Sequence, residues 1–183
     1  SVSFACDTLK AELIGFGAKI TSYKFNKYKT DVKDDFSVSE FYLLTKDFRT
    51  AQAEYEKYFA LNKGIHTARD MVNEPSNVMT PIKAAERASE LSKYGLSVEV
   101  YDEKALASKG FNLMLAVAKG GINPPRFVVI QWKGVPEDKS THAVLVGKGV
   151  CFDSGGISLK PANGMEDMKE DLAGAATVLG TMQ

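Results

Sequence analysis

The sequence predicts a mixed α/β fold in which a mostly parallel sheet is flanked by helices. Helical patterns alternate with short apolar runs over residues 80–147. The runs at 126–132 and 142–147 are continuously apolar, as in strands covered on both faces. We therefore expect the end of a smaller α/β domain over residues 1–47, a connecting helix over 48–76, and the first part of an αβα domain over 77–183.

The first domain is expected to contain one helix and one strand. Residues 9–25 place Leu9, Leu13, Phe16 and Ile20 three or four positions apart, the spacing of an amphipathic helix. Residues 40–45 (EFYLLT) predict a short buried strand. The Ala, Glu and Lys content of residues 50–72 then predicts a long helix, about 30 Å in length, that suits a connector.

The second domain opens with a clear helix start. Thr80 is a good N-cap and Pro81 stands at the first helical position, so we expect a helix to about Tyr94. The following pattern predicts a strand at 96–101, short helices at 103–109 and 113–118, and strands at 126–132 and 142–147.

The last helix is expected to begin at a capping box formed by Asn163 and Glu166. An apolar stripe follows, spaced at three and four residues: Met165, Met168, Leu172, Ala175, Ala176, Leu179 and Met182. Asp171 lies beside this stripe, close enough to the buried face to reach inward.

The overall composition narrows the possible partners and compartment. The 183 residues include 23 basic and 23 acidic side chains, and this balance argues against nucleic acid or a membrane surface as partners. The first residues lack a signal-peptide pattern, and Cys6 and Cys151 form no disulfide framework, so we expect a cytoplasmic protein. Ser1 and the uncapped end at Gln183 suggest a middle fragment of a longer chain.

Residues 146–180 gather charged groups around a Gly-rich turn. Gly147, Gly149, Gly155 and Gly156 flank Lys148 and Asp153, which would let backbone and side chains crowd a small ligand, either a metal or an anion. Neither GxxxxGK[ST] nor GxGxxG is present, which argues against a nucleotide phosphate site.

A metal site fits these residues better. Asp153 and Asp171 offer hard oxygen ligands. A lysine can coordinate a metal when neutral or polarise a carbonyl when protonated, and Lys148 and Lys160 could divide these roles. A regular strand would point Lys148 and Asp153 to opposite faces, so the two converge only if the strand breaks, for example at Gly149. Residue spacing alone leaves solvated turn residues as the alternative.

The segment GKGVCFDSGGISLKPANGMEDMKEDLAGAATVLG closely resembles the signature of the M17 leucyl aminopeptidase (cytosol aminopeptidase) family, GKGxxFDSGGxSxKP followed by MxxMKxDMxGAA. The segments SYKFNKYKT, TARDMVNEPSNVMTP, NPPRFVVIQWKG and HAVLVGKG resemble that family in the same order. The resemblance thus covers most of the chain and implies that residues 77–183 begin a metallopeptidase catalytic domain.

The resemblance also implies roles for individual residues. Lys148 and Asp171 would bind one divalent metal, Asp153 would bridge two, and Lys160 would be catalytic, polarising the scissile carbonyl. Met168 would line the pocket for the first side chain, and all five residues would contact substrate. Leu172 stands where the family commonly has Met, which preserves apolar volume.

The implied protein is a two-metal aminopeptidase, dependent on Mn or Zn, that releases leucine and other apolar N-terminal residues by attack of metal-activated water. The resemblance further implies a homohexamer. The family's NTDAEGR motif, which supplies further ligands and an arginine, has no match here, so we expect the isolated segment to be inactive. The alternative is a non-catalytic binding or architectural protein on the same scaffold.

Other polar and sulfur-containing residues are expected to be structural. Glu166, Asp167 and Glu170 would be solvated charges near a helix start. Cys151 would pack within the sheet as an unreactive thiol, and both histidines, His66 and His142, would be structural.

Overall fold

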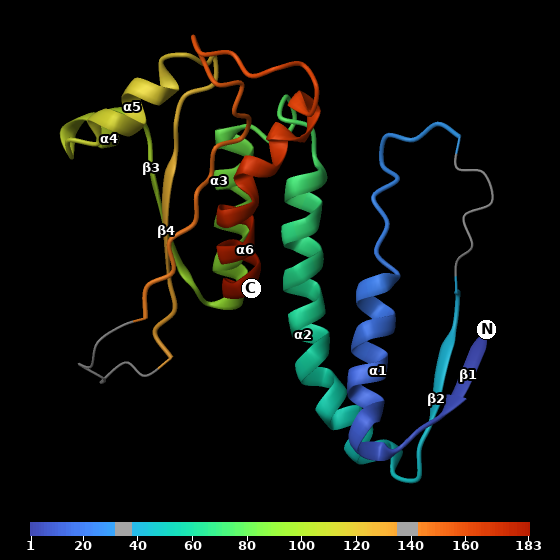
Figure 1. The fold of residues 1–183 in the computed structure, drawn as a ribbon. Helices are drawn as coiled ribbons and strands as arrows, with labels where there is room; N and C mark the ends of the chain where they lie inside the picture. The colour runs from blue at the N-terminus through green and yellow to red at the C-terminus, as the bar shows by residue number, and fades with distance from the viewer. Residues whose placement is uncertain (32–37, 135–142) are drawn as a thin grey trace. The chain divides into compact units, whose positions relative to one another are not determined.

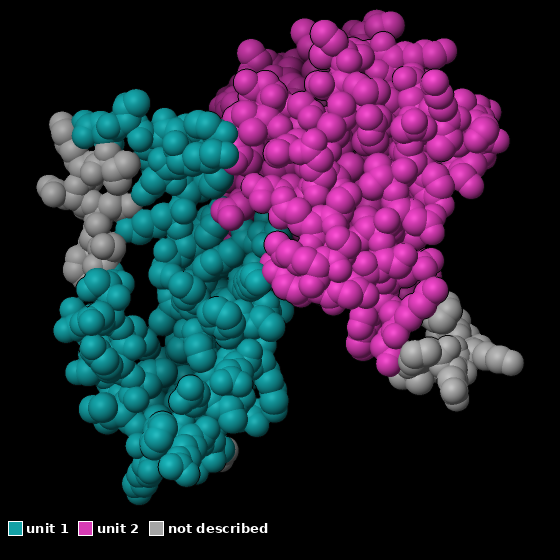
Figure 2. Space-filling view, turned by 180° about the vertical axis from the view of Figure 1, so that it is seen from behind, with its two compact units in different colours: residues 1–67 teal, residues 68–183 magenta. Residues whose placement is uncertain are grey.

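The computed structural model of the chain describes residues 1–31, 38–134 and 143–183. The chain divides into two compact units, unit 1 over residues 1–67 and unit 2 over residues 68–183 (Figure 2). Within these described residues each unit combines helices with one pair of strands, so the predicted mixed α/β class is confirmed. The strand pair of unit 1 is parallel and that of unit 2 is antiparallel.

Unit 1 places a helix against a small parallel sheet. Strand β1 (Val2–Ala5) pairs with β2 (Phe41–Leu44), and helix α1 (Thr8–Thr21) lies between them in sequence. The predicted buried strand at 40–45 is wrong in its burial, because Tyr42 and Leu44 are 52% and 61% exposed. Successive side chains of a strand point to opposite faces, and only one face of this two-stranded sheet is covered.

The long helix α2 (Phe48–Asn73) begins at the start of the expected connecting helix, residues 48–76, and two residues before the range 50–72 that its composition indicates. The Asp47 carboxylate caps it by accepting hydrogen bonds from the backbone N–H of Thr50 (3.2 Å) and its hydroxyl (2.7 Å). Phe16 of α1 packs on Tyr58 of α2 with ring centroids 5.1 Å apart, which gives the amphipathic helix its partner surface. The boundary between the two units falls inside α2.

The helix that follows α2 begins as the sequence predicts. Thr80 caps helix α3 (Pro81–Ser89) by accepting from the Lys83 N–H at 3.3 Å, and the predicted helix continues to residue 94 as the 3₁₀ helix η1 (Glu90–Tyr94). The remaining elements before the glycine-rich segment are β3 (Ser97–Tyr101), α4 (Glu103–Ser108), α5 (Asn112–Ala118) and β4 (Phe127–Gln131).

The strand predicted at 142–147 is not observed in the part that the structure describes. His142 lies outside the described residues, and residues 143–147 form no strand. The chain is instead tied to a helix, since the Ala175 N–H donates to the Lys148 carbonyl at 2.8 Å. A strand requires ladder hydrogen bonds to a neighbouring strand, and among the described residues β3 and β4 form such bonds only with each other.

The last predicted helix has two parts, the 3₁₀ helix η2 (Met165–Leu172) and helix α6 (Ala173–Met182). The predicted capping box at Asn163 is wrong. Gly164 occupies the cap position with a left-handed backbone (φ 78°), and no side chain caps the helix there. A left-handed cap residue is readily accommodated by glycine, and it turns the chain before Asn163 could act as the cap.

A hydrophobic core joins the elements of unit 2. Its buried residues are Met71, Met79, Ala88, Leu91, Leu96, Leu172, Ala176 and Leu179. Figure 1 shows α3 and α6 beside the β3–β4 pair, whose Val98, Val128 and Ile130 pack against this core. Full burial of a leucine contributes about 1.5–3 kcal/mol, so Leu172 and Leu179 anchor η2 and α6 firmly.

Among the helices in the described ranges, none combines the length and apolar character needed to cross a bilayer.

Candidate functional site: two lysine–aspartate pairs

The first pair joins the glycine-rich segment to η2. The Lys148 ammonium lies 2.5 Å from Asp171 Oδ1, and the two side chains are 58% and 22% exposed. Asp171 therefore reaches inward from the helix, as the sequence predicts. Its second oxygen, Oδ2, is buried and has no hydrogen-bond partner within the described part of the chain. Because no hydrogen-bond donor occupies this oxygen, it could bind a cation without first losing a hydrogen bond.

The second pair lies within the Gly-rich turn. Lys160 Nζ is 3.1 Å from Asp153 Oδ2, and the Gly155 N–H donates to Asp153 Oδ1 at 2.9 Å. These two hydrogen bonds, the one from Lys160 first, hold the pKa of Asp153 below its ordinary value, and the charge of Lys148 lowers it further. Lys148 thus acts on both carboxylates, and the two pairs form one electrostatic group.

Met168 of η2 contacts the Lys160–Asp153 pair through its side chain and its backbone. Lys160 Nζ lies 3.0 Å from the Met168 thioether sulfur. The Met168 carbonyl accepts from the Asp153 N–H at 3.4 Å. The five residues predicted to contact substrate are therefore linked through side chains and backbone: Lys148, Asp153, Lys160, Met168 and Asp171.

Two of the glycines permit close approach within the chain itself. A Cβ on Gly147 would lie 2.5 Å from the Gly174 carbonyl oxygen, and one on Gly155 would lie 2.3 Å from the Ser158 oxygen. The space at these two glycines is taken by the chain's own backbone, whereas a Cβ on Gly156 would meet nothing within 4 Å. Gly147 lets residue 148 approach the start of α6, and Gly155, with φ 87°, allows the turn that brings Lys160 to Asp153.

The donor set suits divalent ions. Two carboxylates and one amine gather here, and the buried Asp171 oxygen lacks a partner. No cluster of three His, Cys, Asp or Glu side chains that could hold a metal exists among the described residues. The described groups therefore supply an incomplete ligand set for two ions, in which a lysine nitrogen would have to take part.

The neighbouring acidic residues behave as solvated charges, as the sequence predicts. Glu166, Asp167 and Glu170 are all exposed. Cys151 packs against the core of unit 2 rather than in a sheet, because no strand forms around it. Burial raises the pKa of its thiol to about 11, which suppresses the reactive thiolate.

The sequence reasoning missed the contacts that position η2. Lys169 Nζ lies 3.5 Å from the Asn73 carbonyl, and Gly174 meets the backbone of Lys148. The glycine at 174 in an otherwise apolar helix was the available signal for the second contact, since glycine in a helix often marks close approach of another segment. No local pattern signals the first, which spans 96 residues.

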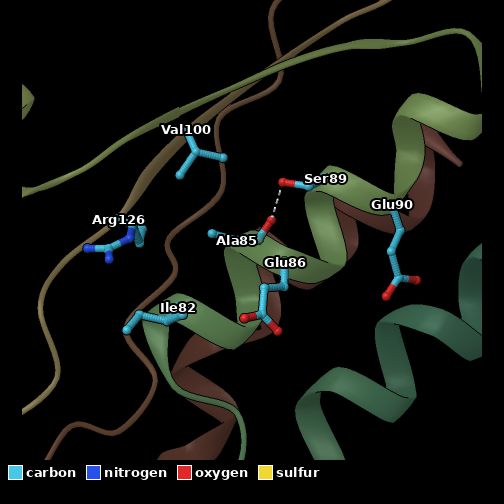
Figure 3. Close-up of a pocket in the computed structure, with 7 residues that line it drawn as sticks. All are labelled: Ile82, Ala85, Glu86, Ser89, Glu90, Val100 and Arg126. Carbon is cyan, nitrogen blue, oxygen red and sulfur yellow. Dashed lines mark hydrogen bonds between the residues drawn. The ribbon is translucent and has the colours of Figure 1, made fainter.

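A shallow hollow lies elsewhere in unit 2, between α3 and β3. Its lining includes Ile82, Glu86, Val100 and Arg126 but none of the five site residues. Figure 3 labels these side chains on α3, on β3 and just before β4. Glu86 already pairs with Lys83 at 2.8 Å. This hollow is therefore not part of the candidate site formed by the two lysine–aspartate pairs.

Known proteins resemble the chain in both sequence and structure. A probable cytosol aminopeptidase from Afipia carboxidovorans is 42% identical over 175 residues, covering 94% of this chain and 35% of that protein. The crystal structure of a cytosol aminopeptidase from Coxiella burnetii matches with TM-score 0.80 and 28% identity, covering 98% of this chain and 38% of that one. The bottromycin maturation enzyme BotP in complex with Mn matches with TM-score 0.77 and 30% identity, covering 97% and 39%.

These matches define the class: the chain shares its sequence and its mixed α/β fold with part of the cytosol aminopeptidases that it resembles. Residues 66–183 match the catalytic domain of the cytosol aminopeptidase family, Peptidase_M17. The chain belongs to this family. It spans about a third of the length of the curated relatives that it matches.

Proposed function

We propose that the complete protein is a metal-dependent aminopeptidase that releases N-terminal residues, preferentially leucine and other apolar ones, from peptides. The observation that carries this proposal is the convergence of two lysine–aspartate pairs, Lys148 with Asp171 and Lys160 with Asp153. Family membership supports the reaction class. A non-catalytic role on the same scaffold is not favoured, since all four of these positions keep their functional groups.

Lys148, Asp153 and Asp171 would hold two divalent ions, Mn or Zn. The Mn complex of BotP, a structural relative, supports this choice. When bound, the ions would supply Lewis-acid activation of water and of the scissile carbonyl. Asp153 suits ligation because its lowered pKa keeps the carboxylate ionised. Lys148 can donate a lone pair only after its ammonium has lost a proton.

Lys160 would be the catalytic lysine. Its ammonium, held by Asp153 at 3.1 Å, carries a fixed positive charge toward the carbonyl oxygen as that oxygen becomes negative. Met168, in contact with Lys160 Nζ, would present an apolar, adaptable surface to the first side chain of the peptide. An apolar preference at that position follows from this lining.

Several properties of the whole protein belong to the same proposal. Residues 1–47 would end an N-terminal α/β domain, residues 48–76 would connect, and residues 77–183 would begin the catalytic domain. A location in the cytoplasm and peptide substrates fit a family named for cytosol aminopeptidases, and a homohexameric assembly belongs to the same proposal. The described ligands are too few for two ions, so the segment alone is expected to be inactive.

The test uses the full-length protein that contains this segment, with Mn²⁺ and leucine p-nitroanilide. Wild type should hydrolyse the substrate, and Lys160→Ala should lower kcat by at least about 100-fold, as loss of an oxyanion stabiliser does. Lys104→Ala, on an exposed part of α4, is the matched control and should retain wild-type turnover. Unchanged turnover in Lys160→Ala would remove Lys160 from its role, and an inactive wild type would refute the aminopeptidase assignment.

A further inference from the structure

The helix that carries Met168 and Asp171 is an unusual one. Helix η2 is a 3₁₀ helix of eight residues, Met165–Leu172, whereas runs longer than three or four residues are uncommon. In a 3₁₀ helix three residues complete a turn, so side chains at i and i+3 lie directly above one another. Such a helix has three flat faces, and each face has its own surroundings.

The three faces of η2 differ in burial and in chemistry. One carries Met168 and Asp171, both half-buried within the site. A second carries Asp167 and Glu170, which are exposed. The third runs from Glu166, which is exposed, through Lys169, half-buried, to Leu172, which is 2% exposed in the core of unit 2. In an α-helix residues three apart would diverge by about 60°, so the 3₁₀ geometry is what stacks Lys169 directly beside Leu172.

Lys169 connects the third face to the end of α2. Its ammonium lies 3.5 Å from the carbonyl of Asn73, the last residue of that helix. The distance is at the outer limit of a hydrogen bond, so the attraction is mainly that of a cation for the negative helix end. The last turn of α2 has no basic residue of its own, and η2 supplies the charge from 96 residues away.

We propose that Lys169 is a positioning residue that fixes the rotation of η2 and thereby aims Asp171 and Met168 into the site. Leu172 holds the C-terminal end of this face, and Lys169 holds it one turn earlier. Two attachments on one face prevent η2 from rolling, and the adjacent face with Asp171 stays directed at Lys148. The inference rests on the proposed function, because it assigns Lys169 a role in holding the metal ligand.

The experiment compares Lys169→Met, Lys169→Arg and the control Lys104→Met in the full-length protein. Lys169→Met keeps an apolar stem of similar length and removes the charge, whereas Lys169→Arg keeps the charge. Three quantities are measured: hydrogen exchange of residues 165–172 in metal-free protein, the Kd for Mn²⁺ by calorimetry, and kcat and KM for leucine p-nitroanilide.

We expect Lys169→Met to exchange faster over residues 165–172 and to bind Mn²⁺ about three- to tenfold more weakly, since outer partners of metal ligands commonly tune affinity by such factors or more. The kcat should fall by a similar factor. Lys169→Arg should stay within about twofold of wild type for all three quantities. If Lys169→Met does not fold, Lys169→Gln, which also removes the charge, replaces it in the same comparison.

A Kd for Mn²⁺ in Lys169→Met that equals that of Lys104→Met would overturn the inference, as would failure of Lys169→Arg to restore it. The proposed function fails in a different way. If wild type binds Mn²⁺ but does not hydrolyse the substrate, the aminopeptidase assignment is lost, while the comparison of Kd values and of exchange rates still decides the role of Lys169.

Discussion

Replacing Gly147 by alanine tests how the site is held together. A Cβ at this position would lie 2.5 Å from the carbonyl oxygen of Gly174, 2.6 Å from its carbonyl carbon and 2.7 Å from the Cα of Ala175. All three are backbone atoms, so no side-chain rotation can relieve the overlap. Either α6 must move away from residue 147 or the segment before Lys148 must move.

The expected cost follows from these contacts. Overpacking in a filled interior costs about 1–3 kcal/mol. Separation of the segments would also lengthen the bond from the Ala175 N–H to the Lys148 carbonyl, now 2.8 Å, which is worth about 1 kcal/mol. We therefore expect a destabilisation of about 2–4 kcal/mol, together with weaker Mn²⁺ binding because Lys148 shifts relative to Asp171.

The assay is thermal unfolding of the full-length variant followed by calorimetric titration with Mn²⁺. Gly17→Ala is the matched control, because a Cβ there meets nothing within 4 Å and alanine favours a helix interior by about 0.5–1 kcal/mol. Gly147→Ala should lower the Tm by at least about 2 °C relative to this control. A Tm and a Kd equal to those of the control would refute the close backbone packing on which the reasoning rests.

Three further outcomes are expected. Hydrogen bonds from Lys160 and the Gly155 N–H lower the pKa of Asp153, so the stability that its carboxylate contributes is present above the ordinary pKa of 3.8 and is lost as the pH falls below that value. Between about pH 4 and pH 3, Asp153→Asn should therefore lose less thermal stability than wild type. Equal losses in the two proteins would contradict this expectation. Burial raises the pKa of Cys151 to about 11, so iodoacetamide at pH 8 should alkylate this thiol more slowly than it alkylates free cysteine. Mass spectrometry of the peptide that contains Cys151 measures the rate. A rate equal to that of free cysteine would show an accessible thiolate. Mn²⁺ binding to wild type should release protons, which calorimetry in two buffers of different ionisation enthalpy measures. Lys148→Met should release fewer protons than wild type. Equal proton release by the two proteins would remove Lys148 from the ligand set.

Local signals in the sequence predicted most of the elements. Thr80 and Pro81 mark the start of α3 because a cap and a fixed φ act within one turn. The inward reach of Asp171 also followed from its place beside the apolar stripe. Such features depend on neighbours a few residues away, and a single sequence displays them directly.

The errors have a common physical cause, which is competition from other segments. Residues 143–147 carry a strand-like apolar run, yet the chain that follows them is bound to α6 by the Lys148 carbonyl. The final helix is divided at Ala173 because η2 adopts 3₁₀ geometry, a choice that hydrophobic spacing at three and four residues cannot distinguish from α. Tertiary contacts decide both cases.

The close approach of Gly147 to Gly174 has a consequence for inheritance. The pairs Lys148–Asp171 and Asp153–Lys160 both lie between these two glycines, as does Met168. One short, continuous stretch of the amino-acid sequence therefore contains the charged groups together with the two small residues that let the stretch fold back on itself. Recombination that exchanges this stretch between two genes of the family transfers the two pairs, Met168 and both glycines together, so these residues are inherited as one unit.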